Sequence, residues 1–351
     1  MDVGLVSDAV RWTCGPLLLL RIARLPAPAS RNALTVSVVV PARDEALTLP
    51  DLLGSLHGDT AEVIVVDDSS SDGTADVARA VGATVLAAPT LPAGWTGKTW
   101  ACATGAAAAA GDVLIFLDAD VTLTPGAIDR LALAVSHSGG LVSVQPFHEM
   151  RRPYERLSLF FNLIGMMAVD AFGPLRHHVA ASGAFGPVLA CRRQDYEAVG
   201  GHTAVRSAII EDVALAHRFR ASGRDVQVYG GAGSASFRMY PSGLRALSEG
   251  WTKNMAAGAG ATRVVTLLVV VAWLSACIEA AFHVASTPLV YVAFALQLWW
   301  LGRRVGRYGP ITALLFPLPL VFFLVVFGRS VIVSRSSRRV RWKGRIVQLE
   351  R

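Results

Sequence analysis

Residues 113–128, VLIFLDADVTLTPGAI, place five apolar residues directly before two carboxylates, Asp118 and Asp120. The apolar run predicts a buried strand, and the residues from 125 onward predict a helix. At an extended strand end, residues i and i+2 point to the same side, so the two carboxylates would repel each other. A bound divalent cation would relieve this repulsion, because such cations take hard oxygen ligands. The alternative is a solvated turn whose acidic residues stabilise the start of the following helix.

The stretch belongs to a longer alternation of strand and helix patterns. The strands are predicted at 35–42, 62–68, 84–89, 113–119 and 141–147, and the helices at 45–56, 74–81, 98–110 and 125–137. Continuous β-branched runs such as TVSVVVPA are typical of strands buried on both faces. The order therefore predicts an α/β fold, Rossmann-like, with a mostly parallel sheet flanked by helices.

Polar residues cluster after three of these strands. They are PARDE at 41–45, DDSSSDGT at 67–74 and DAD at 118–120. In a sheet of this kind, ligands bind beyond the carboxyl ends of the strands. We therefore expect the clusters to converge on one edge. No Gly-x-Gly-x-x-Gly follows the first strand, which argues against a nicotinamide dinucleotide site.

Two further stretches carry candidate catalytic groups. In IIEDVALAHRF, a helix is predicted to begin near Glu211 and to end at Gly223, so Glu211 and Asp212 fall in its first turn. The helix N-terminus favours their ionised forms, and an ionised carboxylate suits a general base. The alternative is favourable helix-end charge without chemistry. Lys98 opens another predicted helix, where it is placed to meet a phosphate or a carboxylate.

The chain has 351 residues, of which 53% are hydrophobic, and the apolar excess is concentrated in residues 264–333. Three candidate membrane spans lie there, at 264–284, 286–301 and 310–333. The third contains Pro317 and Pro319, which predict a broken or re-entrant segment. Trp299 and Trp300 are predicted to anchor the second span at the interface.

Four domains are predicted from this division. They are a membrane-associated helix at 1–30, a catalytic domain at 31–260, transmembrane segments within 261–334 and a basic cytoplasmic tail at 335–351. The first segment carries internal charges and lacks a signal-peptide cleavage site, so we expect a membrane-contacting helix, with a full crossing as the alternative. Residues 157–172 are apolar on most sides, which fits either an internal core helix or a helix at the membrane surface.

The net charge of +7 comes from arginine clusters around 303–307 and 335–345. Because they flank apolar spans, we interpret them as cytoplasmic segments near anionic lipid rather than as a nucleic-acid surface. Glu279 lies near the far end of the first span, where it is expected either to reach interfacial water with His283 or to have a function. His177 and His178 are sequence neighbours whose side chains diverge, so no metal site is assigned to them.

Together, these motifs resemble a membrane-bound family-2 glycosyltransferase with the GT-A fold. The match covers about residues 35–255 and rests on VVVPARDEALTLPDLLGSL, VIVVDDSSSDGT, GKTWACATGA, LDADV and IIEDVALAHRF in this order. The Gln-x-x-Arg-Trp motif of processive synthases is absent near SEGWTKN, which favours transfer of a single sugar. The stretch EGWTKN, the apolar tail and RWKGR are similar to the carotenoid (diaponeurosporenoate) branch, a neighbour of hopanoid-associated transferases.

The resemblance implies a role for each matching residue. Those implied to bind the nucleotide are Pro41, Arg43, Glu45, Asp67, Asp68, Lys98 and Asp118. Asp118 and Asp120 would hold Mn²⁺ or Mg²⁺, and Asp212, with Glu211 beside it, would be the catalytic base. The residues implied to contact the acceptor or a phosphate are Gly183 and Phe185, within 182–202, and Trp251 and Lys253.

The implied reaction is an inverting, metal-dependent transfer of one hexose from a nucleotide-diphosphate sugar, UDP-glucose by resemblance, to a lipid such as a carotenoid. The catalytic domain would face the cytoplasm from a multi-pass membrane protein. Two alternatives stay open. One is transfer to a polyprenyl phosphate, and the other is a non-catalytic, nucleotide-binding membrane scaffold.

Overall fold

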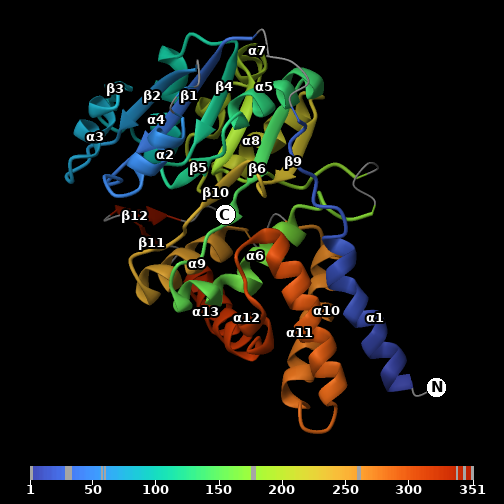
Figure 1. Ribbon diagram of the computed structural model, residues 1–351. Helices are drawn as coiled ribbons and strands as arrows, with labels where there is room; N and C mark the ends of the chain where they lie inside the picture. The colour runs from blue at the N-terminus through green and yellow to red at the C-terminus, as the bar shows by residue number, and fades with distance from the viewer. Residues whose placement is uncertain are drawn as a thin grey trace. The chain divides into compact units, whose positions relative to one another are not determined.

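The computed structural model of the protein describes residues 3–27, 34–56, 58, 61–174, 179–258, 262–336, 339–342 and 345–348. The chain forms two compact units, which are described separately. The sheet unit comprises Ala23–Pro146, Gly183–Arg238 and Lys343–Arg351, and the helical unit comprises Met1–Ile22, Phe147–Ser182 and Met239–Trp342. Figure 1 labels the elements of both units.

A seven-stranded sheet with the order β3-β2-β1-β4-β8-β6-β9 forms the centre of the sheet unit. Its strands are β1 (Val36–Ala42), β2 (Glu62–Asp67), β3 (Thr84–Ala87), β4 (Val113–Leu117), β6 (Leu141–Gln145), β8 (Val188–Arg192) and β9 (Val226–Gly230). The first four strands run parallel, as do β6 and β9, whereas β8 is antiparallel to β4 and β6. The predicted mostly parallel sheet is therefore confirmed.

Helices flank this sheet as predicted. They are α2 (Leu49–Ser55), α3 (Thr74–Ala80), α4 (Gly97–Ala108), α5 (Ala127–Ser138), α7 (Arg193–Ala198), α8 (Glu211–Ala221) and the short 3-10 helix η2 (Gly201–Val205). One core of the unit joins α4, α7 and α8 to the sheet and includes Val39, Phe116 and Phe219. A Cβ atom at Gly105 would lie 2.4 Å from Val39 Cγ1, so glycine is what permits α4 to approach β1 so closely.

Some elements differ from the prediction. Helix α2 begins at Leu49 rather than at 45, because the Thr48 N–H donates to the Glu45 carbonyl and closes a turn before it. Strand β8 lies within 182–202, which the sequence marked as an acceptor-side loop and helix. A short antiparallel pair, β5 (Val121–Leu123) and β10 (Ala235–Phe237), was also not predicted.

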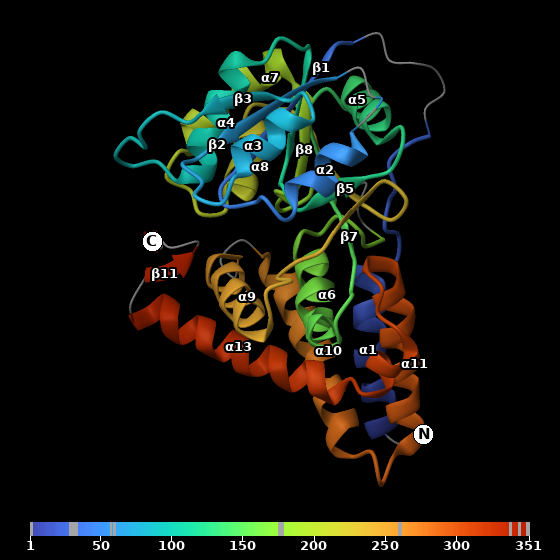
Figure 2. The same cartoon turned by 60° about the vertical axis from the view of Figure 1, so that its left-hand side comes forward.

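The helical unit contains most of the apolar sequence. Its elements are α1 (Val3–Leu18), β7 (Phe147–His148), η1 (Pro153–Ser158), α6 (Leu159–Ala168), α9 (Leu244–Gly258), α10 (Val264–Phe282), α11 (Pro288–Val305), α12 (Pro310–Leu314), α13 (Pro317–Ser336) and β11 (Arg339–Trp342); β12 (Arg345–Gln348) is assigned to the sheet unit. Figures 1 and 2 show α1, α10 and α11 lying along one another, which we call the helix bundle.

Polar contacts make α1 an integral part of the helix bundle. The buried indole N–H of Trp273 donates to Gln297 Oε1 at 2.7 Å, and Gln297 Nε2 donates to the Trp12 carbonyl at 2.7 Å. A Cβ atom at Gly15 would lie 2.5 Å from Trp273 Nε1, so α1 and α10 are in close contact. The predicted N-terminal helix is therefore packed against the C-terminal apolar segment.

Glu279 has a charged partner on a neighbouring helix of the bundle. Its Oε2 lies 2.7 Å from Arg11 Nη2 on α1. His283, with which the sequence grouped it, contacts the Glu279 backbone carbonyl instead of the carboxylate. Because the Glu279 side chain is 48% exposed, this ion pair lies at the surface of the helix bundle, where it joins α1 to α10.

Helix α6 resolves the two interpretations of residues 157–172. Its side chains Phe160, Phe161 and Leu163 are fully buried, and it packs against α10, α11 and α13 within the helical unit. The internal core interpretation is therefore the one that the structure supports. The helix is apolar on most sides because helices surround it.

Among the described residues, one helix is long and apolar enough to cross a membrane, namely α10, of which 33% is buried within the protein. Helix α11 coincides with the second predicted span but includes Gln297, Arg303 and Arg304. The third predicted span is broken, because α12 ends at Leu314 and α13 begins at Pro317. His177 and His178 lie outside the described residues, as does part of the basic tail at 335–351.

Candidate active site

The three polar loops follow neighbouring strands, since β2, β1 and β4 are adjacent in the sheet. Ala42, at the end of β1, pairs in register with Asp67, at the end of β2. Strand β4 ends at Leu117, directly before Asp118. Pro41 lies near the end of β1 and has no backbone N–H. No hydrogen bond to β4 is lost there, because the pairing of β1 with β4 stops at Val39.

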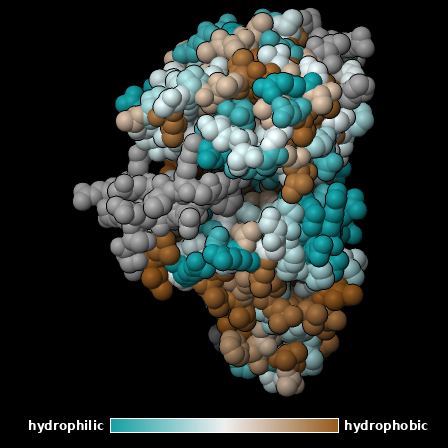
Figure 3. Space-filling model, turned by 90° about the vertical axis from the view of Figure 1, so that its left-hand side faces the viewer, coloured by the Kyte–Doolittle hydropathy of each residue, from teal (hydrophilic) through white to brown (hydrophobic). Residues whose placement is uncertain are grey.

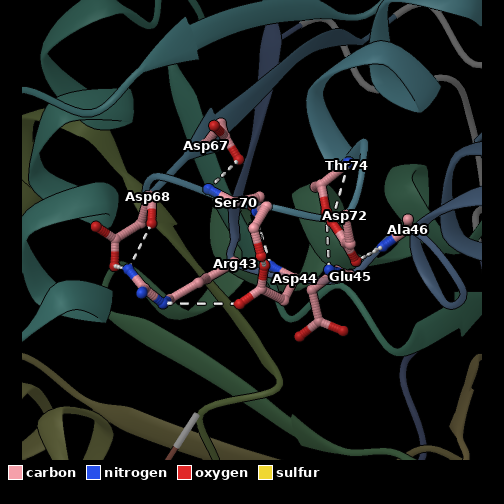
Figure 4. A network of polar contacts seen from close by, with 10 residues as sticks. Arg43, Asp44, Glu45, Ala46, Asp67, Asp68, Ser70, Asp72 and Thr74 are labelled. Atoms are coloured by element: carbon pink, nitrogen blue, oxygen red, sulfur yellow. Dashed lines mark hydrogen bonds and ion pairs between the residues drawn. The ribbon is translucent and has the colours of Figure 1, made fainter. Parts of the chain in front are cut away.

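Arg43 joins the first two loops, as Figure 4 shows. Its Nη1 donates to the Asp68 carbonyl at 2.8 Å and lies 3.7 Å from Asp68 Oδ2. Asp68 is 7% exposed, so its charge is largely removed from water beside the guanidinium. Arg43 and Asp68, both implied to bind the nucleotide, therefore contact each other.

Further contacts within and between these loops use backbone donors and short side chains. The Glu45 N–H donates to Thr74 Oγ1 at 2.8 Å, and the Ser70 N–H donates to Asp67 Oδ1 at 3.3 Å. The Glu45 carboxylate accepts a hydrogen bond from the Thr48 hydroxyl at 2.7 Å. The loops are thus fixed to each other rather than extended independently into solvent.

Lys98 brings the second and third candidate motifs together. Near the start of α4, its Nζ lies 2.7 Å from Asp118 Oδ1 and 2.8 Å from Glu211 Oε1. The Lys98 side chain is 34% exposed, whereas that of Glu211 is 9% exposed. The lysine that was expected to meet a phosphate or a carboxylate thus contacts two carboxylates, one after β4 and one at the start of α8.

The pKa values of this ion-pair network reflect the balance of burial and charge. Burial alone would lower the pKa of Lys98, but Asp118 and Glu211 outweigh it and hold the lysine pKa well above its ordinary value. Burial would likewise raise the pKa of Glu211, and the Lys98 ammonium group outweighs it, so that pKa is lowered. Both groups are therefore charged at neutral pH.

Asp212 behaves in the opposite way to the sequence prediction. Burial, followed by repulsion from the Glu211 carboxylate, raises its pKa to about 7. The helix N-terminus was expected to keep Asp212 ionised, but at this position desolvation and a like charge prevail. Two adjacent carboxylates therefore have their pKa values moved apart, a pattern typical of acid–base sites.

Gly186 is a site residue that the sequence did not single out. A Cβ atom there would lie 3.1 Å from Asp212 Oδ2 and 3.2 Å from Lys98 Nζ. Its neighbour Phe185 is held by Ser143, whose Oγ accepts from the Phe185 N–H at 2.7 Å. The predicted acceptor-side residues Gly183 and Phe185 therefore lie in the loop that approaches Asp212 and Lys98. The second glycine of SGAFGP, Gly186, was the available sequence signal for such a close approach.

His202 and Tyr196 form a buried pair in the same unit. The His202 N–H donates to the Tyr196 hydroxyl at 3.0 Å, and His202 Nδ1 lies 3.0 Å from the same oxygen. Burial lowers the pKa of His202 to about 4, with the Glu211 charge opposing this shift only in part. The imidazole is therefore neutral at pH 7 in the neighbourhood of Glu211. It closes the stretch 182–202 that the sequence marked as an acceptor-side loop and helix, but no role was assigned to it there.

Asp118 and Asp120 lie in a turn rather than on an extended strand. Strand β4 ends at Leu117, and the Val121 N–H donates to the Asp118 carbonyl at 3.1 Å. The alternation rule that placed both carboxylates on one side therefore does not apply to this pair. Both residues remain partly exposed, and α5 follows only after β5.

The chemistry of this turn fits a hard divalent cation. Asp118 and Asp120 supply carboxylate oxygens at the same sheet edge, and Lys98 engages one oxygen of Asp118. Within the described part of the chain, no group of three or more His, Cys, Asp or Glu side chains is placed to hold a metal. Mg²⁺ is commonly held by one or two carboxylates together with water and substrate phosphates.

Trp251 and Lys253 belong to the helical unit rather than to the sheet unit. Both lie on α9, and Trp251 is buried, with its indole N–H donating to Ser158 Oγ at 3.0 Å. Its ring stacks on Phe161 with the centroids 4.7 Å apart. Trp251 is therefore a packed core residue of the helical unit.

Comparisons with known proteins agree with the motifs. Residues 37–185 match the family model described as Glycosyl transferase family 2. The chain is 35% identical to the 4,4'-diaponeurosporenoate glycosyltransferase of Staphylococcus aureus (strain MRSA252), over 97% of this chain and 96% of that protein. The enzyme of the same name from Staphylococcus haemolyticus (strain JCSC1435) is 36% identical, over 89% and 88%.

A solved structure shows the same fold over nearly the whole chain. It is that of a mannosyltransferase from Pyrobaculum calidifontis in complex with GDP-Man and Mn²⁺, with a TM-score of 0.56 and 18% identity, over 93% of this chain and 95% of that one. The resemblance to the GT-A fold is thereby confirmed. The protein is a glycosyltransferase, and the chain belongs to glycosyl transferase family 2.

Proposed function

We propose that this glycosyltransferase moves a single hexose from a nucleotide-diphosphate sugar, UDP-glucose in the first instance, to a lipid acceptor such as a carotenoid. The observation that carries the proposal is the contact of Lys98 with both Asp118 and Glu211. It joins the predicted diphosphate end of the site to the predicted catalytic pair. A donor with its phosphates near Asp118 would thus have its anomeric carbon within reach of Asp212.

The nucleotide would lie along the carboxyl ends of β1 and β2. Pro41, Glu45 and Asp67 would contact the nucleoside, and the Arg43–Asp68 pair would hold the two loops in place. Lys98 would stay near the diphosphate because its ammonium group is already fixed at this edge. A divalent cation held by Asp118 and Asp120 would neutralise the charge that develops on the departing diphosphate.

Transfer would be a single in-line displacement with inversion. An acceptor oxygen attacks the anomeric carbon while the bond from that carbon to the diphosphate oxygen breaks. For a hydroxyl acceptor, Asp212 takes the proton, and its pKa of about 7 is suited to a base that works near neutral pH. Glu211, ion-paired to Lys98, orients the start of α8 rather than accepting the proton.

The names of the relatives support a carotenoid acceptor of a particular kind. They act on diaponeurosporenoate, whose name denotes a carboxylate. A carboxylate is already ionised at neutral pH and needs no proton removed. With such an acceptor, Asp212 would orient the nucleophile without removing a proton. Replacing Asp212 would then change the rate of transfer much less than with a hydroxyl acceptor, which would distinguish the two acceptor types.

The same proposal includes a membrane location. Helices α1, α10 and α11 would cross the bilayer, and the catalytic unit would face the cytoplasm. The apolar length of α10 and the packing of α1 and α11 beside it support this arrangement. Arg303, Arg304 and Arg307, at the end of α11, would then obey the positive-inside rule.

Two measurements test the function. Detergent-purified protein is incubated with a panel of UDP- and GDP-sugars with and without Mn²⁺ or Mg²⁺, and we expect metal-dependent release of the nucleotide from one donor. Lipids from cells with and without the protein are then compared by mass spectrometry, and we expect one hexose added to a carotenoid. A hexosyl polyprenyl phosphate as the product would contradict the proposal that the acceptor is a carotenoid. Nucleotide binding without hydrolysis of any donor would contradict sugar transfer and support the non-catalytic scaffold.

A further inference from the structure

The first turn of α4 holds a further segment besides Asp118 and Glu211. The Thr96 N–H donates to the Arg206 carbonyl at 2.9 Å, and the Thr99 hydroxyl donates to the same carbonyl at 2.7 Å. Arg206 directly follows η2 and precedes the short connection to α8. Helix α4 therefore fixes the backbone at the point where the chain leaves η2 for α8.

The Thr99 hydroxyl has one hydrogen and two carbonyl oxygens within reach. The Thr96 carbonyl lies 3.0 Å from Thr99 Oγ1, but it already accepts from the Trp100 N–H at 3.0 Å. The Arg206 carbonyl is nearer, at 2.7 Å, and has the more favourable distance for an O–H donor. The hydroxyl hydrogen is therefore directed to Arg206 rather than back into α4.

The contact between Thr99 and Arg206 is shielded from water on the side of α4. Thr99 is 0% exposed, and Val205, which precedes Arg206, is 7% exposed. A buried donor that loses its acceptor finds no replacement in solvent, which is why such groups are nearly always paired. Displacing the Arg206 carbonyl would therefore leave the Thr99 hydroxyl with a poorer partner, so the contact resists movement.

The chain is also fixed on the upstream side of Arg206. The 3-10 helix η2 packs against α4, and the His202 N–H donates to the Tyr196 hydroxyl at 3.0 Å. A Cβ atom at Gly201 would lie 2.3 Å from Tyr196 Cζ, so glycine permits this close approach. The path of the backbone is therefore determined from η2 as far as Arg206.

The connection downstream of Arg206, residues 207–210, is neither helix nor strand. The Ala208 N–H donates to the Val205 carbonyl at 3.0 Å, a local contact that ties the connection to no other element. Its path thus depends on how its two ends are held.

Neighbouring residues of α4 hold these two ends. Thr99 binds the Arg206 carbonyl, and Lys98 binds the Glu211 carboxylate with 2.8 Å between Nζ and Oε1. Because Lys98 and Thr99 belong to one helical turn, the separation between the ends of the connection is set by α4. The turn thereby determines where α8 begins.

We propose that Thr99 is a positioning residue of this glycosyltransferase, which acts through the Arg206 carbonyl to hold the start of α8 and with it Asp212. The Asp212 carboxylate lies against Gly186 and has to stay there to meet an acceptor. A misplacement of about 1 Å at a reacting group can cost roughly 10²-fold in rate. The inference rests on the proposed base role of Asp212, and the experiments below test the contact separately from that role.

Three variants separate the hydroxyl group from the rest of the fold. Thr99→Val keeps the shape of the side chain and removes the hydroxyl, whereas Thr99→Ser keeps the hydroxyl. Thr104→Val is the matched control on the same helix. The buried Thr104 hydroxyl makes no hydrogen bond with another described residue, so its removal breaks none.

Hydrogen exchange measured by mass spectrometry tests the contact itself. Hydrophobic side chains gather on the surface of the helical unit, as Figure 3 shows, so the full chain is kept in detergent. We expect amides in 206–214 to exchange about tenfold faster in Thr99→Val than in the wild type or Thr99→Ser, the effect of one lost hydrogen bond. Exchange in β2 should not change. Equal exchange of 206–214 in Thr99→Val and the wild type would overturn the proposal.

Hydrolysis of UDP-glucose in the presence of Mn²⁺ tests the effect on the reaction. The water oxygen bonds to the anomeric carbon, the bond from that carbon to the diphosphate oxygen breaks, and Asp212 takes the proton. We expect kcat to be about tenfold lower in Thr99→Val, with an unchanged KM for UDP-glucose. Thr99→Ser should restore most of the rate, and Thr104→Val should leave it unchanged. A wild-type kcat in Thr99→Val would overturn the positioning role.

A double variant shows whether Thr99 acts through Asp212. The base is already lost in Asp212→Asn, so adding Thr99→Val should lower kcat no further. A second tenfold loss would show that Thr99 acts on another group and would overturn the proposal. A wild-type rate in Asp212→Asn alone would instead contradict the base role in the proposed function, while faster exchange of 206–214 in Thr99→Val would still support the contact.

Discussion

Lys98 at the start of α4 and Glu211 at the start of α8 form an ion pair with 2.8 Å between Nζ and Oε1. The same ammonium group lies 2.7 Å from Asp118, so one lysine orders the residues on both sides of it. Because Glu211 is almost fully buried, this pair also decides which of the two neighbouring carboxylates is ionised. The predictions below start from this relationship.

Replacing Lys98 should disable the site while leaving the fold in place. In Lys98→Met, Glu211 loses its counter-charge and Asp118 loses its partner, so we expect turnover to fall about 10²- to 10³-fold. Arg79→Met removes an exposed ion pair with Asp76 and serves as the control, with turnover unchanged. Equal turnover in the two variants, measured with the same donor and acceptor, would show that Lys98 is not needed for transfer.

Asp212→Asn should separate the two kinds of acceptor. With a hydroxyl acceptor the variant loses its base, and kcat should fall about 10²- to 10⁴-fold. With a carboxylate acceptor no proton has to be removed, so a much smaller loss is expected. Full activity of the variant on a hydroxyl acceptor would rule out the base role.

The pH dependence follows from the raised pKa of Asp212. Below its pKa of about 7 the carboxyl group is protonated and cannot accept a proton, and above it the group is ionised. For a hydroxyl acceptor, kcat/KM should therefore rise with pH through about 7 and then level off. The rise should be absent in Asp212→Asn and with a carboxylate acceptor. A profile that is flat for the wild type with a hydroxyl acceptor would contradict this assignment.

Gly186→Ala tests the loop that approaches the proposed catalytic residue Asp212. The new Cβ would lie 3.1 Å from Asp212 Oδ2, so the carboxylate must shift by a few tenths of an ångström. We expect a measurable rate loss that is smaller than the roughly 10²-fold cost of a 1 Å misplacement. Gly54→Ala on α2, where nothing lies within 4 Å of the added atom, is the matched control. The thermal midpoints of both variants should stay close to that of the wild type. A rate loss in Gly54→Ala as well would point to an unspecific effect.

The parallel sheet and its helices could be predicted because their sequences carry their own signal. Runs such as VSVVV are buried on both faces wherever they pair, and the polar loops after β1, β2 and β4 had to meet once those strands became neighbours. The strand β8 could not be predicted in the same way. Its four apolar residues, VLAC, are too short to be told from a loop, and its place between β4 and β6 depends on long-range pairing.

The candidate site, too, could be predicted only where its signal is local in the sequence. The types of residue at the site were visible in motifs, but their partners were not, because Lys98, Asp118 and Glu211 come from three separate segments. The pKa shift of Asp212 was predicted in the wrong direction. The position of Asp212 in its helix can be read from the local sequence, whereas its burial and its distance from the Glu211 charge depend on the tertiary fold. Gly186 was overlooked because only the fold brings it against Asp212 and Lys98.

The contact between Gly105 and Val39 leads to a prediction about stability. In Gly105→Ala the added Cβ would lie 2.4 Å from Val39 Cγ1, and overpacking of this kind costs about 1–3 kcal/mol. Gly165→Ala on α6, which has open space at the Cβ position, should not destabilise the protein. Denaturant unfolding of both variants measures the difference, and a Gly105→Ala variant as stable as the wild type would show that α4 can move away from β1.

The packing of α1 against α10 and α11 has a consequence for the assembly of the helix bundle during synthesis. Helix α1 leaves the ribosome long before the segments that supply Trp273, Gln297 and Glu279, so during synthesis Arg11 has no carboxylate opposite it. Until α10 emerges, that arginine needs water, a lipid phosphate or an insertion factor as a temporary partner. Assembly of the helix bundle therefore includes a late docking event in which α1 is captured by two helices that are made much later.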